Sequence, residues 1–324
     1  MTENTATAIA HPNIAFIKYW GNRDAALRLP ANGSISMNLA GLFTRTTVTF
    51  SPDIPEDTLL INQQPAQPEE LQRVQIILNL FRYITGAKLA ARVVTENNFP
   101  IGAGIASSAS AFAALTLATS TALNLGLSTE QLSCLARRGS GSAARSIPAG
   151  FVEWLAGEDD RSSFARSLAP AEHWDLVDCI TIVSAGHKAV GSTAGHALAE
   201  TSPLQAARVA DAPRRLDLCR QAIVERDFEK LAAVVEQDSN LMHAVMLTST
   251  PSLLYWEPAT VRLMQAVQQM RANGLPVCYT IDAGPNVHVL TTADARPKVE
   301  VELDQIPGVK KILFATPGGG VTLA

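Results

Sequence analysis

The chain has 324 residues, of which 47% are hydrophobic and 17% are charged, and its formal net charge is −4. A hydrophobic fraction of this size can form a large core, and such scattered charges are not typical of disorder. Single cores stop growing at about 250 to 300 residues, so two domains are expected. The weak negative charge gives no broad basic surface, which argues against nucleic acid and anionic membranes as partners.

The sequence also disfavours secreted and membrane proteins. The four cysteines lie far apart without CxxC spacing or paired histidines, so neither disulfides nor structural zinc are expected. Residues 1–13 contain no basic region followed by an apolar core, and no signal peptide is predicted. Residues 109–127 are apolar, but their Ser, Thr and Asn residues indicate a buried helix rather than a membrane span. We therefore expect a cytoplasmic protein.

Strands and helices are both predicted along the chain, which indicates an α+β fold. Hydrophobic periodicity and end signals predict, in chain order, strands at 14–20 and 44–50, a helix at 68–85, a strand at 91–95, helices at 109–127 and 128–138, a strand at 174–184, helices at 203–227, 228–247 and 257–273, and a strand at 276–282. The clearest end signals are Gly86, which closes helix 68–85, and the STEQ segment, in which Ser128 caps a helix and Gln131 completes a capping box.

The segment FPIGAGIASSASAF, residues 99–112, opens a helix from a loop rich in glycine and serine. Gly102 and Gly104 allow tight turns, and the free N–H groups at the helix start attract an anion. Ser107 and Ser108 add hydroxyls. These features predict a phosphate-binding loop, while the missing GxxxxGK spacing excludes a Walker A loop. Small residues before an alanine-rich helix also allow close helix packing, which is the alternative.

Three charged residues have unusual local contexts. Asp282 ends an apolar strand before a glycine turn, a position that projects a carboxylate into a cleft, although such a residue also caps turns. Lys18 lies inside the strand predicted at 14–20, where it either serves chemistry or blocks aggregation at a sheet edge. Arg145 follows a Ser-Gly-Ser segment, a context that favours binding of a ligand. The alternative is an ordinary charge at the end of a helix.

Four blocks of the chain, in order, resemble a known family. They are HPNIAFIKYWGNRD at 11–24, NNFPIGAGIASSASAF at 97–112, RRGSGSAARSIPAGFVEW at 137–154 and TIDAGPNVHVL at 280–290, with EQDSNLMHAV at 236–245 between the last two. Together they resemble mevalonate diphosphate decarboxylases, ATP-dependent members of the GHMP kinase superfamily. The resemblance implies a ribosomal S5 domain-2-like domain at 1–184 and a ferredoxin-like domain at 185–324, with the active site between them. The last strand either stays in the second domain or returns to the first.

The resemblance implies an ATP-dependent reaction in isoprenoid biosynthesis. The 3-hydroxyl of a phosphorylated mevalonate is phosphorylated, and the substrate then loses carbon dioxide. ATP and Mg²⁺ are the implied cofactors, and relatives are commonly homodimers. The protein ligands of Mg²⁺ are left open, because Ser107 or Ser108 with phosphate oxygens and water would suffice.

Site residues follow from the same resemblance. Asp282 takes or orients the proton of the 3-hydroxyl, and Lys18 keeps Asp282 ionised and stabilises the transferring phosphate. Arg145 holds the substrate carboxylate during decarboxylation. Substrate contacts are implied for Tyr19, Asn22, Ser140, Gly141, Ser142, Ser192 and Thr193. ATP contacts are implied for Asn97, Gly102, Gly104, Ala106, Ser107 and Ser108. The histidines at 187, 196, 243 and 288 have no ligand spacing and are expected to pack or cap.

Two positions depart from the family pattern. Where relatives read KYWGK, this chain has Asn22, and where they usually carry an arginine after the serine at 192, it has Thr193. Each lost cation removes a charge-assisted contact of about 1.5 to 3 kcal/mol with the substrate diphosphate. We therefore expect mevalonate 5-phosphate as substrate and isopentenyl phosphate as product. The 5-diphosphate is the alternative, with compensation by Arg23, His187 or Lys188.

Two other classes of GHMP protein are less consistent with the chain. A mevalonate 3-kinase would lack part of the set formed by Asp282, Lys18 and Arg145, and this chain keeps all three. A non-catalytic sensor of ATP and metabolite would lose the aspartate or the lysine and gain a surface for its partner. Neither change is visible in the sequence.

Overall fold

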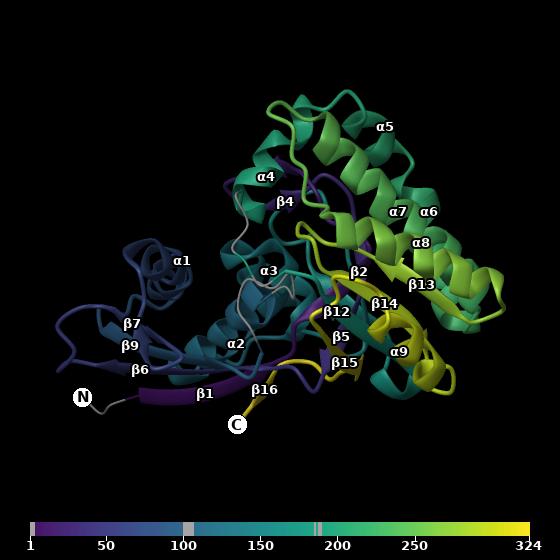
Figure 1. Ribbon diagram of the computed structural model, residues 1–324. Coiled ribbons are helices and arrows are strands. Elements are labelled where there is room, and N and C mark those ends of the chain that lie inside the picture. Colours follow the sequence, from purple (N-terminus) through teal and green to yellow (C-terminus); the bar gives the residue numbers. More distant parts are fainter. Residues whose placement is uncertain (1–3, 100–106, 185, 187–189) are drawn as a thin grey trace.

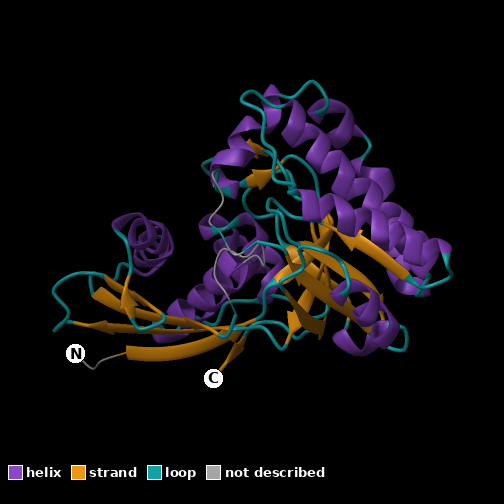
Figure 2. Cartoon of the chain, in the orientation of Figure 1, coloured by secondary structure: helices purple, strands orange, loops and turns teal. Residues whose placement is uncertain are grey.

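The computed structural model describes residues 4–99, 107–184, 186 and 190–324. Two large β-sheets with helices packed on them, and one small two-stranded sheet, make up the described part of the chain (Figures 1 and 2). The predicted α+β class is confirmed. Within the described residues, no helix combines the length and the apolar character needed to cross a bilayer.

The first sheet carries helices on one face. Its strands, in spatial order, are β16 (Thr322–Leu323), β1 (Asn4–Ala10), β6 (Thr44–Ser51), β9 (Ala90–Asn97), β7 (Thr58–Ile61) and β8 (Gln64–Pro65). The helices beside it are α1 (Pro68–Thr85), α2 (Ser107–Ala122) and α3 (Thr129–Gly139). Val48 and Val93 of this sheet share one apolar core with Phe81 of α1 and Phe112 of α2. This packing fixes the start of α2, where the glycine-rich segment enters.

The second sheet is covered on both faces. Its strands, in order, are β11 (Ala165–Ala169), β10 (Phe151–Trp154), β5 (Ser34–Ala40), β15 (Lys311–Pro317), β12 (Leu176–Ile182), β14 (Val287–Thr292) and β13 (Val277–Thr280), and β2 (Asn13–Ile17) also pairs with β5. One core includes α6 (Ala212–Glu225) and α7 (Phe228–Thr248), and another includes α8 (Pro258–Ala272) and α9 (Arg296–Asp304). The turn after β13 therefore emerges from a rigid layered unit.

Several short elements complete the fold. They are the hairpin of β3 (Asn22–Asp24) with β4 (Leu29–Pro30), the 3₁₀ segment Gly141–Ser146, α4 (Ser192–Leu198) and α5 (Gln205–Ala210). The C-terminal strand β16 pairs with β1, where Ala8 faces Leu323. The end of the chain thus lies in the sheet that contains its beginning.

The local signals of the sequence predicted several elements well. Helix α1 has the predicted bounds, since Pro68 starts it and Gly86 ends it with φ of 72°. The capping box of Ser128 and Gln131 forms at the start of α3. The helix predicted at 203–227 is instead two helices, α5 and α6, divided at Asp211, since the proline that follows cannot donate a helical hydrogen bond.

The strand predicted at 14–20 is also shorter than expected. Strand β2 ends at Ile17, so Lys18 lies just beyond its end rather than inside it. The interpretation of Lys18 as an edge-strand lysine is therefore wrong. The residue is instead buried, with 1% of its surface exposed.

Candidate active site

One cavity gathers most of the residues that the sequence singled out. Its lining includes Lys18, Tyr19, Ser108, Ser140, Gly141, Ser142, Arg145, Ser192, Thr193 and Asp282. These residues come from the end of β2, the starts of α2 and α4, the 3₁₀ segment and the turn after β13. Segments far apart in the chain therefore converge on one polar pocket.

Lys18 and Asp282 form the charged centre of the cavity. Lys18 Nζ lies 2.6 Å from Asp282 Oδ1. Burial lowers the pKa of the Lys18 ammonium, and the nearby charge and hydrogen bond of Asp282 oppose that shift. The Asp282 side chain keeps 28% of its surface exposed, so it faces the cavity while its lysine partner is enclosed.

The backbone of Lys18 is held by charged side chains from the helical layer. Its N–H donates to Asp238 Oδ2 of α7 at 2.6 Å, and its carbonyl accepts from Arg208 Nη2 of α5 at 2.8 Å. Asp238 Oδ1 accepts in turn from Arg215 Nε of α6 at 2.7 Å, and neither side chain of that pair is exposed. We call Arg208, Arg215 and Asp238 the backbone clamp. It positions Lys18 without contacting its ammonium.

Helix α7 also fixes the turn that carries Asp282. The Ile281 N–H donates to Ser239 Oγ at 3.0 Å, and His243 Nε2 lies 3.3 Å from the Ile281 carbonyl. The carbonyl can only accept, so Nε2 carries the proton. Burial lowers the pKa of His243 to about 4, and the ring is neutral at pH 7. The turn itself closes through a 2.7 Å bond from Gly284 N–H to the Asp282 carbonyl.

Arg145 is a buried cation that reaches the same cavity. Its Nε donates to Asn13 Oδ1 at 3.2 Å, and its Nη1 donates to Ser34 Oγ at 2.6 Å. Asn13 Nδ2 donates to the Ser142 carbonyl at 3.1 Å, which ties β2 to the 3₁₀ segment. Burial lowers the pKa of Arg145 to about 10, so the guanidinium stays charged at neutral pH. A cation held by neutral partners is suited to bind an anion.

Three serine hydroxyls form a row beside this cation. Ser108 Oγ lies 3.2 Å from Ser140 Oγ, which lies 3.4 Å from Ser142 Oγ. Between the last two, Gly141 leaves room for the ring of Tyr19, because a Cβ at that position would lie 2.5 Å from Tyr19 Cε1. The row offers hydroxyl donors to an anionic ligand.

Tyr19 lies in an aromatic group at the cavity wall. Its ring stacks on His196 with centroids 4.1 Å apart, and its hydroxyl donates to Asn22 Oδ1. His196 Nδ1 accepts the Gly21 N–H at 3.0 Å. Burial and then the charge of Arg28 lower the pKa of His196 to about 3, so the imidazole is neutral. His196 therefore packs, as predicted, but it also lines the cavity.

One of the residues predicted to contact the substrate does not line the cavity. Asn22 is not among the described residues that line it, and its amide oxygen is occupied by Tyr19. Arg23, a proposed compensating cation, is exposed and donates to the Ala156 carbonyl at 3.3 Å and to the Gly157 carbonyl. His187 and Lys188 lie outside the described residues.

A second, more apolar cavity adjoins the first. It is lined by Leu59, Ile61, Val74, Val93, Phe112 and Leu115, with Asn97, Ser107 and Ser108 among its polar residues. Arg73 and Ser108 line both cavities. The predicted ATP contacts Gly102, Gly104 and Ala106 lie outside the described residues. An apolar pocket with a few polar groups is typical of a site for an organic ring system.

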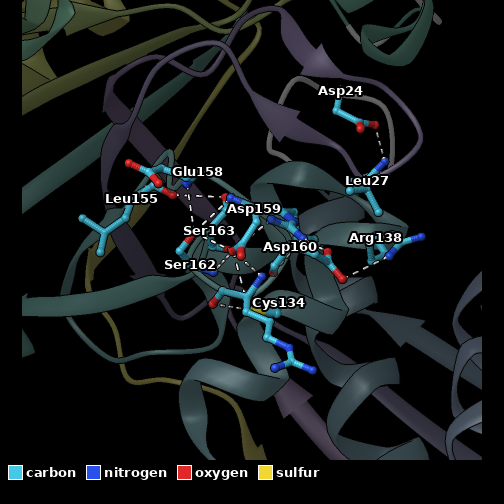
Figure 3. Close-up of polar contacts among 12 residues, drawn as sticks. Asp24, Leu27, Cys134, Arg138, Leu155, Glu158, Asp159, Asp160, Ser162 and Ser163 are labelled. Carbon is cyan, nitrogen blue, oxygen red and sulfur yellow. Dashed lines mark hydrogen bonds and ion pairs between the residues drawn. The ribbon is translucent and has the colours of Figure 1, made fainter.

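Sequence reasoning missed several residues of the site. Arg28 and Arg73 line the first cavity, yet no local motif marks them, since they come from a turn and from the second turn of α1. Arg138, in the last turn of α3, does not line this cavity and instead pairs with Asp160 at 3.5 Å (Figure 3). Asp238 belongs to the EQDSNLMHAV segment, which carries part of the family resemblance but no predicted role. Its helical spacing from the apolar residues Val234 and Met242, four positions to either side, was the available signal.

No acidic cluster for a metal appears in the described part of the chain, where no three His, Cys, Asp or Glu side chains come together to hold an ion. Serine hydroxyls are present in both cavities, with Ser108 common to the two. This donor set fits Mg²⁺ only as a companion of phosphate, because Mg²⁺ commonly keeps waters and binds phosphate oxygens with few protein ligands.

Two family models match the chain. The model described as the diphosphomevalonate decarboxylase-like N-terminal domain matches residues 10–165. The model described as the mevalonate 5-diphosphate decarboxylase C-terminal domain matches residues 179–312.

Similar proteins carry two related names. The diphosphomevalonate decarboxylase of Aspergillus fumigatus is 42% identical over 305 residues, which cover 87% of this chain and 75% of that protein. The human diphosphomevalonate decarboxylase is 40% identical over 314 residues, covering 89% and 77%. The phosphomevalonate decarboxylase of Haloferax volcanii is 34% identical over 297 residues, covering 91% and 90%.

Solved structures agree with the sequence matches. The mevalonate diphosphate decarboxylase from Enterococcus faecalis is 36% identical, with a TM-score of 0.94 over 100% of this chain and 99% of that chain. The enzyme from Staphylococcus aureus is 35% identical, with a TM-score of 0.94 over 100% and 98%. Another structure, 36% identical with a TM-score of 0.94 over 100% and 99%, is described as a complex with MVAPP, AMPPCP and magnesium.

Proposed function

Because the chain belongs to the diphosphomevalonate decarboxylase family, whose members are ATP-dependent lyases with the two-domain GHMP kinase fold, we propose that its substrate is mevalonate 5-phosphate. The products are isopentenyl phosphate, carbon dioxide, ADP and inorganic phosphate. The observation that carries this choice is the pair of neutral residues Asn22 and Thr193 at positions where relatives are expected to carry cations.

The first chemical step is phosphorylation of the 3-hydroxyl. Asp282 accepts or orients the hydroxyl proton while the oxygen attacks the γ-phosphorus of ATP. Lys18, 2.6 Å from that carboxylate, keeps it ionised and offsets charge on the transferring phosphoryl group. The backbone clamp holds Lys18 in place for this work.

The second step is loss of the carboxylate. Arg145 binds this group, and the serine row at 108, 140 and 142 supplies further donors. The electrons of the bond between C1 and C2 form the new double bond as the 3-phosphate leaves, so that carbon dioxide and inorganic phosphate are released together with the alkene. A fixed carboxylate favours this alignment.

ATP is proposed to occupy the second cavity. Its apolar walls suit the adenine ring, and Asn97, Ser107 and Ser108 provide polar contacts. Arg73, which lines both cavities, is placed to contact phosphates that pass between them. Mg²⁺ would be held by phosphate oxygens, water and a serine hydroxyl at 107 or 108, and it would neutralise phosphate charge. The relative described with AMPPCP and magnesium supports the binding of ATP and Mg²⁺ as such.

Substrate choice rests on the charge of the terminal phosphate. A diphosphate carries more charge than a monophosphate and gains more from added cations, at about 1.5 to 3 kcal/mol for each charge-assisted contact. The name of the Haloferax volcanii relative supports the monophosphate, whereas the Aspergillus fumigatus and human names support the diphosphate.

The test is to restore the two cations. The double variant Asn22→Lys with Thr193→Arg should shift the ratio of kcat/KM toward the 5-diphosphate by at least about tenfold, the value of one such contact. The matched control, Ala25→Lys with Ala194→Arg, adds the same charges to the same hairpin and helix at exposed positions. An equal shift in both double variants would show that general charge, not these two positions, sets the preference.

The two-domain boundary and the oligomer are further proposals. We place the boundary between residues 184 and 185, just after β12, which lies in the second sheet. The pairing of β16 with β1 supports a last strand that returns to the first domain. The homodimer expected from the resemblance stays a prediction.

A further inference from the structure

Arg28 occupies a constrained position in the hairpin that also carries Asn22. Strands β3 and β4 pair Asn22 with Pro30 and Asp24 with Leu29. Asp24 Oδ1 accepts the Leu27 N–H at 2.8 Å and closes the turn (Figure 3). Arg28 follows with φ of 51°, in the left-handed region that residues with side chains rarely adopt. The turn thus fixes where the arginine leaves the backbone.

Arg28 has no carboxylate as an ion-pair partner in the part of the chain that the structure describes. Among the described residues that line the first cavity, four are cationic, at 18, 28, 73 and 145, and one, Asp282, is a carboxylate. Asp282 is engaged by Lys18. Among the described residues, no carboxylate forms an ion pair with Arg28, and its charge instead acts on Tyr19, Arg73 and His196.

These neighbours do not neutralise the guanidinium. Burial raises the pKa of Tyr19 to about 12 and lowers that of His196 to about 3, so both rings are uncharged at pH 7. Arg73 has the same sign of charge, and burial followed by the charge of Arg28 lowers its pKa. The like charges of the three arginines at 28, 73 and 145 repel one another in this cavity, and a bound anion offsets that cost in free energy.

We propose that Arg28 binds the phosphate group of the substrate and supplies, from the turn of the hairpin, the cation that Asn22 lacks. This inference rests on the proposed function, because it names the phosphate ligand of the same cavity. One planar guanidinium matches the oxygens of one phosphate in a bidentate arrangement. A single arginine at this place therefore suits a monophosphate.

The phosphate could belong either to the substrate or to the nucleotide, and the cavity lining favours the substrate. Arg73 and Ser108 line both cavities and are placed to meet the nucleotide. Arg28 lines the first cavity together with Tyr19, His196, Ser192 and Thr193, and it is absent from the lining of the second.

The experiment compares Arg28→Gln with Arg23→Gln in the full-length protein. Arg23 belongs to the same hairpin but is exposed and bound to backbone carbonyls. Calorimetric titration with mevalonate 5-phosphate, without ATP, measures substrate affinity directly. Arg28→Gln should weaken this binding roughly 10- to 100-fold, whereas Arg23→Gln should change it less than about threefold. Titration with ATP should give similar affinities for both variants and the wild type.

A further variant and a further ligand distinguish a failure of the role of Arg28 from a failure of the proposed substrate. Arg28→Lys, which keeps the charge without the planar fork, should recover part of the affinity. Equal affinity of Arg28→Gln and the wild type for mevalonate 5-phosphate would overturn the inference, and so would a loss confined to ATP. A parallel titration with the 5-diphosphate tests the proposed function separately. If the wild type prefers the diphosphate but Arg28→Gln weakens both ligands, the role of Arg28 stands and the monophosphate specificity fails.

Discussion

At the scale of single residues, the proposed chemistry depends on a carboxylate and an ammonium held 2.6 Å apart, Asp282 Oδ1 and Lys18 Nζ. Asp282→Asn keeps the shape of the side chain but removes the base, and its amide can still meet Lys18. We expect kcat to fall by about 100- to 10,000-fold, the usual contribution of a positioned general base. Steady-state kinetics measure this loss, and ATP titration should show an affinity close to that of the wild type. A fall of tenfold or less would contradict the role of Asp282.

Arg145 is expected to act later in the reaction. In the Arg145→Leu variant the substrate carboxylate loses its cation, so carbon dioxide release should fall more than ADP formation in a single turnover. Quenched-flow sampling of both products, with detection of a 3-phosphorylated intermediate, measures the difference. Because Arg145 also bonds Asn13 and Ser34, thermal unfolding must show that the variant is folded. Equal loss of both products without an intermediate would leave Arg145 with no separate role in decarboxylation.

At the scale of elements, the backbone clamp connects helices α5, α6 and α7 to the backbone of Lys18 at the end of β2. Asp238→Asn removes the buried one of the two carboxylates that pair with Arg215, and it weakens the bond to the Lys18 N–H. We expect a loss of about 3 to 5 kcal/mol in the free energy of unfolding and a lower kcat. Urea unfolding and steady-state kinetics provide the two measurements.

A matched control for the clamp exists on the same arginine. Asp211 pairs with Arg215 at 2.6 Å, but its side chain is 38% exposed and does not contact Lys18. Asp211→Asn should lower the free energy of unfolding by no more than about 1 kcal/mol and leave kcat unchanged. If Asp238→Asn destabilised the protein yet kept the wild-type kcat, the clamp would be structural only.

Elements with strong local signals were predictable from sequence, and elements set by tertiary contacts were not. Helix α1 has a proline at its start and Gly86 at its end, and both act locally. The end of β2 carries no such signal. Lys18 leaves the strand because Asp238, 220 residues away, takes its N–H. Likewise, no local sequence signal near Arg28 predicts that it shares a cavity with residues of α1, α4 and the end of β2.

At the scale of the whole molecule, stability should fall in acid because two histidines are buried in neutral form. The pKa of His196 is lowered to about 3 and that of His243 to about 4, from an ordinary value near 6.5. Below pH 6.5 the unfolded chain binds protons that the folded protein does not, so the free energy of unfolding decreases as the pH falls toward 4. His288 has a raised pKa beside Asp178, and its contribution has the opposite sign.

Replacement of one histidine tests this pH dependence. When the pH falls from 6 to 5, the free energy of unfolding of His196→Gln should decrease by about 1 kcal/mol less than that of the wild type. The reason is that the variant takes up one fewer proton on unfolding. Urea unfolding at the two pH values measures this difference. The substitution also removes the aromatic stack with Tyr19, but that loss is the same at both pH values and drops out of the comparison. An identical change in wild type and variant would contradict a neutral, buried His196.

The cavity as a whole, whose described lining places four cations around one carboxylate, should determine both the reaction and the choice of substrate. The most direct test gives the wild-type protein ATP and Mg²⁺ with mevalonate 5-phosphate or with the 5-diphosphate, and follows ADP, carbon dioxide and the alkene product together. We predict a higher kcat/KM for the 5-phosphate, with equal amounts of ADP, carbon dioxide and isopentenyl phosphate. A higher kcat/KM for the 5-diphosphate would contradict the monophosphate specificity, and ADP formed without carbon dioxide from either substrate would contradict the decarboxylase.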